Sequence, residues 1–198
     1  MGKSPLWAGA CLLAILASAA RAEVTLEAPA QVPAGASFEV RWNGEANPAD
    51  VLTLVPPDAP EDQRRTYKYA RSTAATFVAP DDPGTYEIRY LAKGSSSPIR
   101  ARRTIEVTPV SATLSGPTTI EAGGTLELTW TGPGNDRDFI TVVAAGSEEK
   151  TYGTYAYLSS GSPATLVAPE APGEYEARYL TGQKYYTLAS HTFSVTAP

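Results

Sequence analysis

The sequence contains two copies of one pattern, and this duplication restricts the folds that are open to the chain. Trp42-Asn43-Gly44 returns 88 residues later as Trp130-Thr131-Gly132, and Pro83-Gly84-Thr85-Tyr86 returns 89 residues later as Pro172-Gly173-Glu174-Tyr175. A one-residue insertion therefore separates the copies. Repetition at a fixed spacing predicts similar structural units in tandem, and we place two domains at residues 23–109 and 110–198.

The first 22 residues have the pattern of a secretory signal peptide. Lys3 precedes an uncharged apolar run at residues 6–20, and Ala20-Arg21-Ala22 gives the small residues that signal peptidase reads. The run is shorter than the roughly 20 residues that cross a bilayer. Cys11 lies inside the run, whereas a lipid-attachment cysteine would lie at its end. We therefore expect a mature chain that begins at Glu23 and keeps no stable membrane span.

Loss of this leader would remove the only cysteine and the only methionine. The mature chain would then have no disulfide, no cysteine nucleophile and no thiolate metal site. It would keep 14 basic and 21 acidic residues, a net charge of −7, with −2 in the first copy and −5 in the second. A chain this acidic is not expected to bind nucleic acid.

Helix signals are nearly absent, because 17 prolines and 16 glycines interrupt the chain. Short runs rich in Val, Thr, Tyr and Phe recur between these breaks, as expected for strands. Seven such strands are predicted in the second copy, at residues 112–114, 125–130, 139–143, 154–157, 164–167, 175–180 and 188–195. Seven short strands in about 90 residues are typical of a β-sandwich.

Alternation predicts which side chains face the interior. Phe38, Val40 and Trp42 share one face of their strand, and the matching strand of the second copy ends on Trp130 in the same way. Both indoles are therefore predicted to be buried anchors of equivalent cores.

Two motifs resemble the tyrosine corner of immunoglobulin-like sandwiches. These are Gly84-x-Tyr86 and Gly173-x-Tyr175, in a fold where the tyrosine hydroxyl bonds to backbone near the start of a strand. Disulfide-bearing members have a cysteine two residues later, where this chain has Ile88 and Ala177. The resemblance implies an all-β fold class, with two tandem seven-stranded immunoglobulin-like β-sandwiches without disulfides.

The repeats also resemble the immunoglobulin-like modules attached to von Willebrand factor A-type proteins of bacteria. The resemblance lies in Pro33-Ala34-Gly35, Val40-Arg41-Trp42, Asp138-Phe139-Ile140-Thr141-Val142 and Ala171-Pro172-Gly173-Glu174-Tyr175. It covers nearly all of the mature chain, but the chain has no room for an A domain. It therefore implies an accessory or binding module, with no catalytic residue and no metal-dependent adhesion site to carry over.

Candidates for chemistry are few. His191 is the only histidine and no Gly-x-Ser-x-Gly motif occurs, so no nucleophile, base and orienting group can be assembled. Asn135, Asp136 and Asp138 offer oxygen ligands that suit Ca²⁺, but the spacing of a calcium loop is missing and Asx residues in turns usually bond their own backbone. We predict no enzyme activity, no metal site and no cofactor, and leave calcium open.

Two surfaces are candidates for binding. Arg89, Arg100 and Arg102 fall on neighbouring strands, where they would form an exposed basic face for an acidic partner, or a solvated face balanced by Glu87 and Glu106. The second copy has seven of the 11 tyrosines, and three of them lack a counterpart in the first copy. We hypothesise that these three, with a neighbouring lysine, border a contact surface; the residues are Tyr152, Tyr185, Tyr186 and Lys184.

The sequence thus favours an exported, non-enzymatic interaction module of the bacterial cell envelope, periplasmic or secreted, that recognises a protein partner. A carbohydrate-binding module is the first alternative, and it would need aromatic rings aligned on one exposed face. A two-domain periplasmic chaperone is the second. Close copies are unusual in such chaperones, and no basic pair at a domain cleft can be identified.

Overall fold

Alternating apolar residues form short antiparallel strands in a computed structural model that describes residues 23–44, 47–95 and 98–198. The signal peptide predicted at residues 1–22 lies outside these residues. In the first domain a sheet of order β1-β3-β6 faces a sheet of order β2-β8-β7-β4-β5. The strands are β1 (Thr25–Glu27), β2 (Gln31–Pro33), β3 (Ser37–Asn43), β4 (Val51–Val55), β5 (Thr66–Tyr69), β6 (Ala74–Val78), β7 (Gly84–Leu91) and β8 (Ile99–Thr108).

The second domain repeats this topology. Its sheets have the orders β14-β11-β9 and β10-β16-β15-β12-β13. The elements are β9 (Thr113–Ser115), β10 (Thr119–Glu121), β11 (Thr125–Thr131), β12 (Phe139–Ala144), β13 (Tyr155–Tyr157), the 3₁₀ turn η1 (Leu158–Ser160), β14 (Ala164–Val167), β15 (Gly173–Leu180) and β16 (Thr187–Thr196). The all-β immunoglobulin-like class is therefore confirmed in both copies.

The sequence did not predict how the first strand of each domain behaves. It divides into two short pieces, and the second piece crosses to the other sheet. There Val32 pairs with Val107 and Ile120 pairs with Val195, both in parallel. Three-residue pieces are too short to show an alternation, so β10 was not expected. Each sandwich has seven strands when the two pieces count as one.

Each domain has its own hydrophobic core. Trp42 is 4% exposed within the first core, which confirms its predicted burial. Trp130 differs: it is half-buried at the edge of the second core. Its ring meets Tyr179 edge-on at 5.7 Å, and its Nε1 donates to the Gly161 carbonyl at 3.3 Å. The prediction of two equivalent anchors is therefore only partly correct.

Both tyrosine corners are confirmed. The Tyr86 hydroxyl donates to the carbonyl of Asp82 at 3.1 Å, and the Tyr175 hydroxyl donates to the carbonyl of Ala171 at 3.0 Å. Each bond ties the start of a central strand, β7 or β15, to the loop that precedes it.

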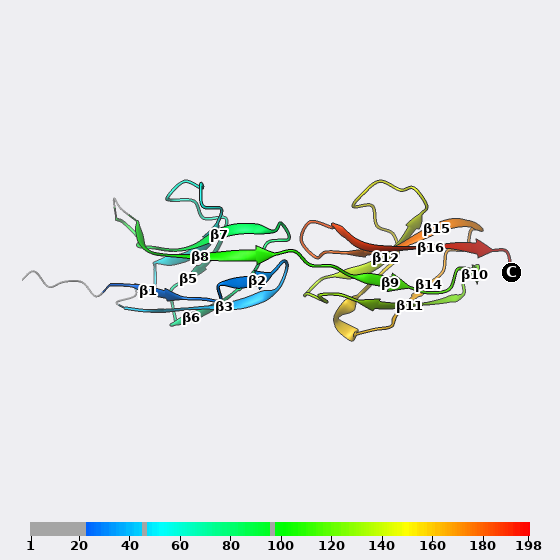
Figure 1. Cartoon of the computed structure of the whole chain (residues 1–198), viewed down its shortest axis with the longest axis horizontal. Helices are drawn as coiled ribbons and strands as arrows, with labels where there is room; N and C mark the ends of the chain where they lie inside the picture. The colour runs from blue at the N-terminus through cyan, green and yellow to red at the C-terminus, as the bar shows by residue number, and fades with distance from the viewer. Residues whose placement is uncertain (1–22, 45–46, 96–97) are drawn as a thin grey trace, which may run out of the picture.

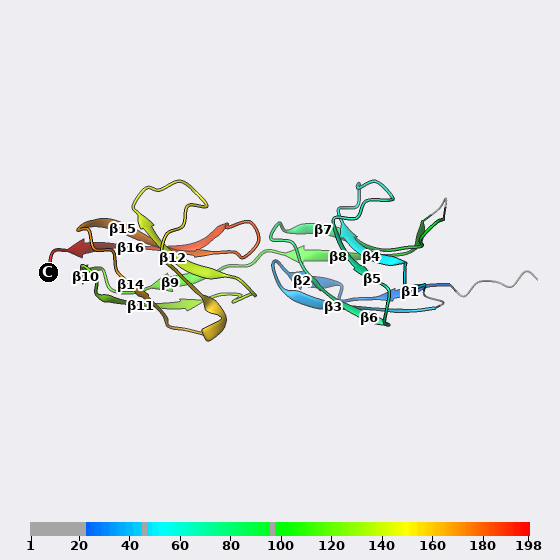
Figure 2. The same ribbon diagram turned by 180° about the vertical axis from the view of Figure 1, so that it is seen from behind.

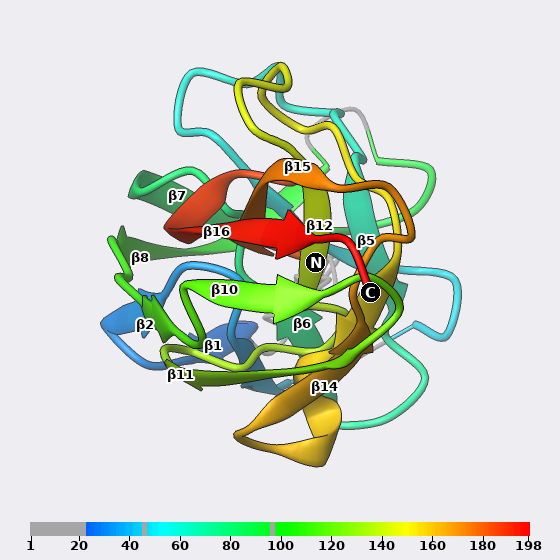
Figure 3. The same cartoon turned by 90° about the vertical axis from the view of Figure 1, so that its right-hand side faces the viewer.

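The two sandwiches lie end to end, with β8 leading directly to β9 (Figures 1 and 2). Viewed along this axis, the loop between β4 and β5 and the loop between β12 and β13 rise on the same side (Figure 3). The outer faces of the two five-stranded sheets therefore share one side of the molecule.

The unequal burial of the two indoles predicts unequal losses of stability. Trp42→Ala should lower the free energy of unfolding by about 3–5 kcal/mol, because it leaves a large cavity. Trp130→Ala should cost about 1–3 kcal/mol, because part of that ring is already in water. Urea unfolding followed by circular dichroism measures both values, and equal losses would contradict this assignment.

Candidate functional site

The β15–β16 loop of the second domain contacts the first domain through a buried carboxylate. Oδ2 of Asp81 accepts hydrogen bonds from the Thr181 hydroxyl at 2.6 Å, the Lys184 amide at 2.8 Å and the Gln183 amide at 3.3 Å. The Gln183 side-chain amide also donates to the Ala79 carbonyl at 2.7 Å. Asp81 and Thr181 are both buried. Hydrogen bonds to a charged acceptor are among the stronger ones, so these contacts fix the loop against the first domain.

Lys184 and Tyr186 take part in the same junction. The Lys184 ammonium pairs with Asp82, and the Tyr186 hydroxyl donates to Oδ1 of Asp82 at 2.8 Å. The bond from Lys184, followed by the bond from Tyr186, lowers the pKa of Asp82, and Asp82 in turn raises the pKa of Lys184. The ion pair is therefore complete at neutral pH and is lost only as the pH falls through the lowered pKa of Asp82, below the usual range of a carboxyl. These two side chains were predicted to border a contact surface for a partner. The structure shows that they contact the first domain of the same chain.

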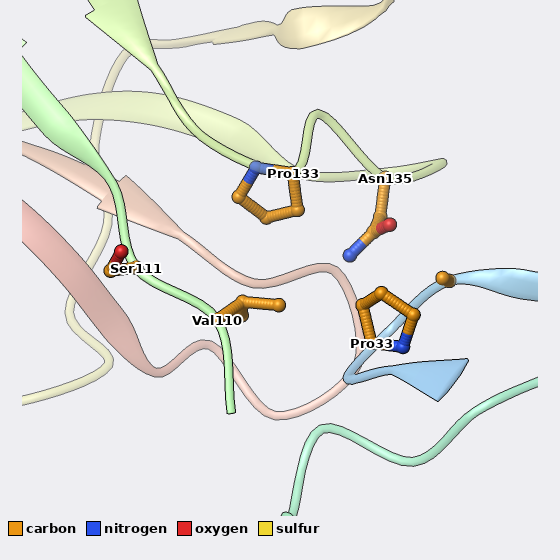
Figure 4. A pocket seen from close by; sticks show the side chains of 6 residues that line it. Pro33, Val110, Ser111, Pro133 and Asn135 are labelled. Atoms are coloured by element: carbon orange, nitrogen blue, oxygen red, sulfur yellow. The ribbon is translucent and has the colours of Figure 1, made fainter. Parts of the chain in front are cut away.

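A second contact crosses the junction close to Asp81. The side-chain amide of Asn135 donates to the Ala34 carbonyl at 2.9 Å. Gly35 permits this approach, since a Cβ there would lie 2.4 Å from the amide nitrogen of Asn135, and its φ is +75°. Beside it, Pro33, Val110 and Pro133 line a hollow of about 310 Å³ between the domains (Figure 4).

Asp138, one of the three residues for which calcium binding was left open, is hydrogen-bonded to groups of the protein itself. Its Oδ2 accepts from the Asn135 amide and the Tyr179 hydroxyl, both at 3.0 Å, and its Oδ1 accepts from the Gly182 amide at 2.9 Å. Burial is the largest influence on this carboxyl and raises its pKa. Asp136 is exposed. No cluster of metal-ligating side chains is found within the described residues.

The first domain repeats this arrangement at Asp50. Oδ2 of Asp50 accepts from the Asn47 amide at 3.3 Å and the Tyr90 hydroxyl at 3.1 Å, and Oδ1 accepts from the Lys93 amide at 2.8 Å. An Asn and an Asp three residues apart therefore make equivalent hydrogen bonds in both copies, and these bonds are structural.

Arg89, the central residue of the predicted basic face, is only 1% exposed and so does not take part in an exposed surface. Its side chain points away from the core, as alternation requires, but the loop after β4 covers it. The guanidinium donates to three carbonyls of that loop, at Pro57, Ala59 and Pro60, each at 2.9 Å, and to Glu87 at 2.8 Å. Arg178 makes the matching contacts in the second domain. The prediction of an exposed Arg89 is therefore wrong.

The other two arginines of that face are exposed. Arg102 forms ion pairs with Glu87 at 3.0 Å and Glu61 at 3.2 Å, so its charge is balanced on the sheet surface. Arg100 lies two residues earlier, on the same face of β8. This arrangement matches the solvated face more closely than a continuous basic patch.

An aromatic cluster forms on the outer face of the second domain. Four tyrosine rings surround Phe139, with ring centroids 5.4–6.3 Å from that of Phe139 and interplanar angles of 62–84°. Two rings come from β13, one from the preceding loop and one from the β15–β16 loop. We call these five residues the aromatic cluster: Phe139, Tyr152, Tyr155, Tyr157 and Tyr185.

The aromatic cluster is accessible. Tyr152, Tyr155 and Tyr157 are 53%, 47% and 49% exposed, whereas Phe139 is buried beneath them. Together the five residues line a hollow of about 80 Å³. Hydrogen bonding with Tyr157 raises the pKa of Tyr155, so the Tyr155 phenol is neutral at physiological pH.

Tyr185 reaches the aromatic cluster through an unusual backbone conformation. Its φ is +59°, in the left-handed region that a non-glycine residue rarely occupies. This turn sends Tyr185 to the cluster while Lys184 and Tyr186, on either side, contact the first domain. The sequence prediction thus identified Tyr152 and Tyr185 and missed Phe139, Tyr155 and Tyr157.

The remaining candidate for chemistry is His191, which contacts the backbone of a neighbouring segment. Nε2 of His191 lies 3.1 Å from the backbone carbonyl of Pro117. Within the described residues, no helix is long and apolar enough to cross a membrane.

No protein-family model and no curated protein sequence matches the chain. Solved structures similar to it include the human OSCAR ligand-binding domain, at 18% identity and a TM-score of 0.32, covering 88% of this chain and 98% of that one. A chimeric titin Z1Z2 carrying a decorin peptide has 15% identity and a TM-score of 0.36, covering 89% and 96%. A segment of two fibronectin type-III domains from chicken tenascin has 16% identity and a TM-score of 0.33, covering 85% and 95%.

Likenesses at these TM-scores carry no argument about function, and the fold class rests on the strand order and the tyrosine corners. Nothing found links the repeats to von Willebrand factor A-type proteins, so that part of the resemblance stays a prediction.

The junction predicts that one carboxylate controls the orientation of the domains. Asp81→Ala removes an acceptor of three bonds and should let the domains reorient independently. Glu170→Ala is the matched control, since Glu170 holds the equivalent position in the second copy and is exposed. Residual dipolar couplings should fit one alignment tensor in the native protein and the control, and two in Asp81→Ala. A single tensor in Asp81→Ala would contradict the assignment.

Proposed function

We propose that the protein is a non-enzymatic binding module that recognises a protein partner through the aromatic cluster. The observation that carries this proposal is the exposure of three tyrosines around one buried phenylalanine. Tyrosine offers a large apolar ring and a polar hydroxyl at low entropic cost, and it is enriched at the energetic centres of protein interfaces. A surface of this kind suits a contact that combines apolar burial with hydrogen bonds.

The orientation of the rings favours a protein over a glycan. A sugar ring stacks on an exposed aromatic face, so a glycan platform needs rings that lie in one plane. The neighbouring tyrosines instead meet at 74–80°, edge against face. Their faces therefore point in different directions and do not form the flat platform on which a sugar ring stacks.

The end-to-end arrangement supports binding rather than chaperoning. Direct hydrogen bonds join the two domains beside the hollow between them, and the ammonium of Lys184 is already paired there with Asp82. A client-binding cleft between the domains would need a free cationic pair at this place.

Export to the periplasm or the cell exterior remains part of the proposal. It rests on the leader pattern of residues 1–22 and on an acidic chain that, without the leader, has no cysteine. The partner would then be another protein of the cell envelope.

The test compares two sets of tyrosines. Changing Tyr152, Tyr155 and Tyr157 to serine should weaken binding of a captured envelope partner by about tenfold or more, because truncated interface tyrosines carry much of the binding energy. Tyr67 and Tyr69 are 45% and 46% exposed on β5 of the first domain, and changing both to serine is the matched control.

Affinity measured by calorimetry with the captured partner decides the outcome, with circular dichroism confirming that both variants fold. The proposal fails when the triple variant binds as tightly as the native protein, or when both sets of changes weaken binding equally.

A further inference from the structure

The aromatic cluster has the geometry of an open box. The Phe139 ring forms its floor, and the four tyrosine rings stand at 62–84° to that floor. Among the walls, Tyr152 meets Tyr155 at 80° and Tyr185 at 75°. The hollow that all five residues line is about 80 Å³. Aromatic rings thus surround one small hollow on several sides.

Perpendicular aromatic walls favour one chemical class of occupant. The face of an aromatic ring carries partial negative charge, and a cation within about 6 Å of the ring centroid is attracted to it. Several rings around one hollow add these attractions at one place. A methylated ammonium also tolerates apolar surroundings, because much of its charge is spread over the methyl groups, whereas a plain ammonium is more strongly hydrated.

The box is not filled by a cation of the protein itself. In the part of the chain that the structure describes, Arg71 lies over the ring of Tyr69, and Lys150 and Lys184 lie over the ring of Tyr186. None lies over a ring of the aromatic cluster. These contacts show that phenol rings in this protein attract cations, while the five rings of the cluster remain open.

The second domain is acidic, and its negative charge also favours a cation as the occupant of the hollow. Residues 110–198 contain nine acidic and four basic residues. Lys184 is already neutralised by Asp82, and Arg178 by Glu176. A domain with this balance attracts basic segments over distances of about a Debye length.

We infer that the aromatic cluster binds the ammonium end of a lysine side chain, unmodified or methylated, presented by a basic segment of the partner. This inference rests on the proposed function and specifies its chemistry. The surrounding tyrosine hydroxyls are placed to bond the backbone of that segment.

The experiment uses the purified protein with small probes in place of the partner. Butylammonium and choline represent the plain and methylated ammonium, and pentan-1-ol and 3,3-dimethylbutan-1-ol are their neutral counterparts of similar shape. Each is titrated at constant ionic strength while the ligand methyl signals and the tyrosine ring signals are followed by NMR. At least one cation should bind about tenfold more tightly than its neutral counterpart, with its methyl signals shifted upfield by the rings.

Three variants test whether the cation binds at the aromatic cluster. Tyr155→Leu should weaken binding of the cation about tenfold, and Tyr155→Phe should keep it, because the attraction needs the ring and not the hydroxyl. Tyr67→Leu is the matched change on β5 of the first domain and should leave binding unchanged. Circular dichroism confirms folding, and the signals of the first domain give an internal reference.

The possible failures are distinct. Equal affinity for cation and neutral probe, or no shift with either cation, overturns the inference. If partner binding still depends on the tyrosines, the proposed function then stands alone. Cation binding that Tyr155→Leu leaves intact places the site elsewhere and also overturns the inference. If a cation binds at the cluster but the affinity of the partner does not depend on the cluster, the proposed function is overturned. The inference that a lysine of the partner occupies the cluster is then overturned as well.

Discussion

The bonds from the β15–β16 loop to Asp81 are the contact on which the rest of the surface depends. They hold the Thr181 hydroxyl and two backbone amides against the first domain. Lys184 and Tyr186 then pair with Asp82, and Tyr185 is left between them with a left-handed backbone that turns its ring to the aromatic cluster. Strain of this kind costs about 1–3 kcal/mol and persists where the surroundings over-determine it. The first domain supplies those surroundings, so it acts as a support for the site on the second.

The sequence predicted the elements that depend on local pattern. Alternation placed Phe38, Val40 and Trp42 inside, and the duplicated Gly-x-Tyr motifs predicted both tyrosine corners. It failed where burial depends on a segment far away in the chain. Arg89 does point outward, but the loop after β4 folds back and covers it. Alternation gives the direction of a side chain and says nothing about which loop lies above it.

The prediction of a contact surface came from residues that differ between the two copies. Such differences do not say whether a residue contacts another molecule or the other domain of the same chain. Residues without a counterpart were predicted to contact a partner. For Tyr186 and Lys184 the partner is the first domain of the same chain. Tyr155 and Tyr157 were overlooked because Tyr67 and Tyr69 match them. The decisive difference lies beneath them, where Phe139 pairs with Tyr157 in one domain and Val51 pairs with Tyr69 in the other. The larger Phe139 side chain contacts the surrounding tyrosine rings. The pattern of surface residues alone does not predict this buried contact.

The same comparison shows that the residues of the junction are not repeated at the equivalent positions of the other copy. At the far end of the second domain, the positions of Asp81 and Asp82 are held by Glu170 and Ala171. At the far end of the first domain, the position of Lys184 is held by Ser95. At these described positions neither copy repeats the carboxylate pair or the ammonium that meet at the junction. The junction therefore depends on residues in which the two copies differ, whereas the aromatic cluster is built from residues of the second domain alone.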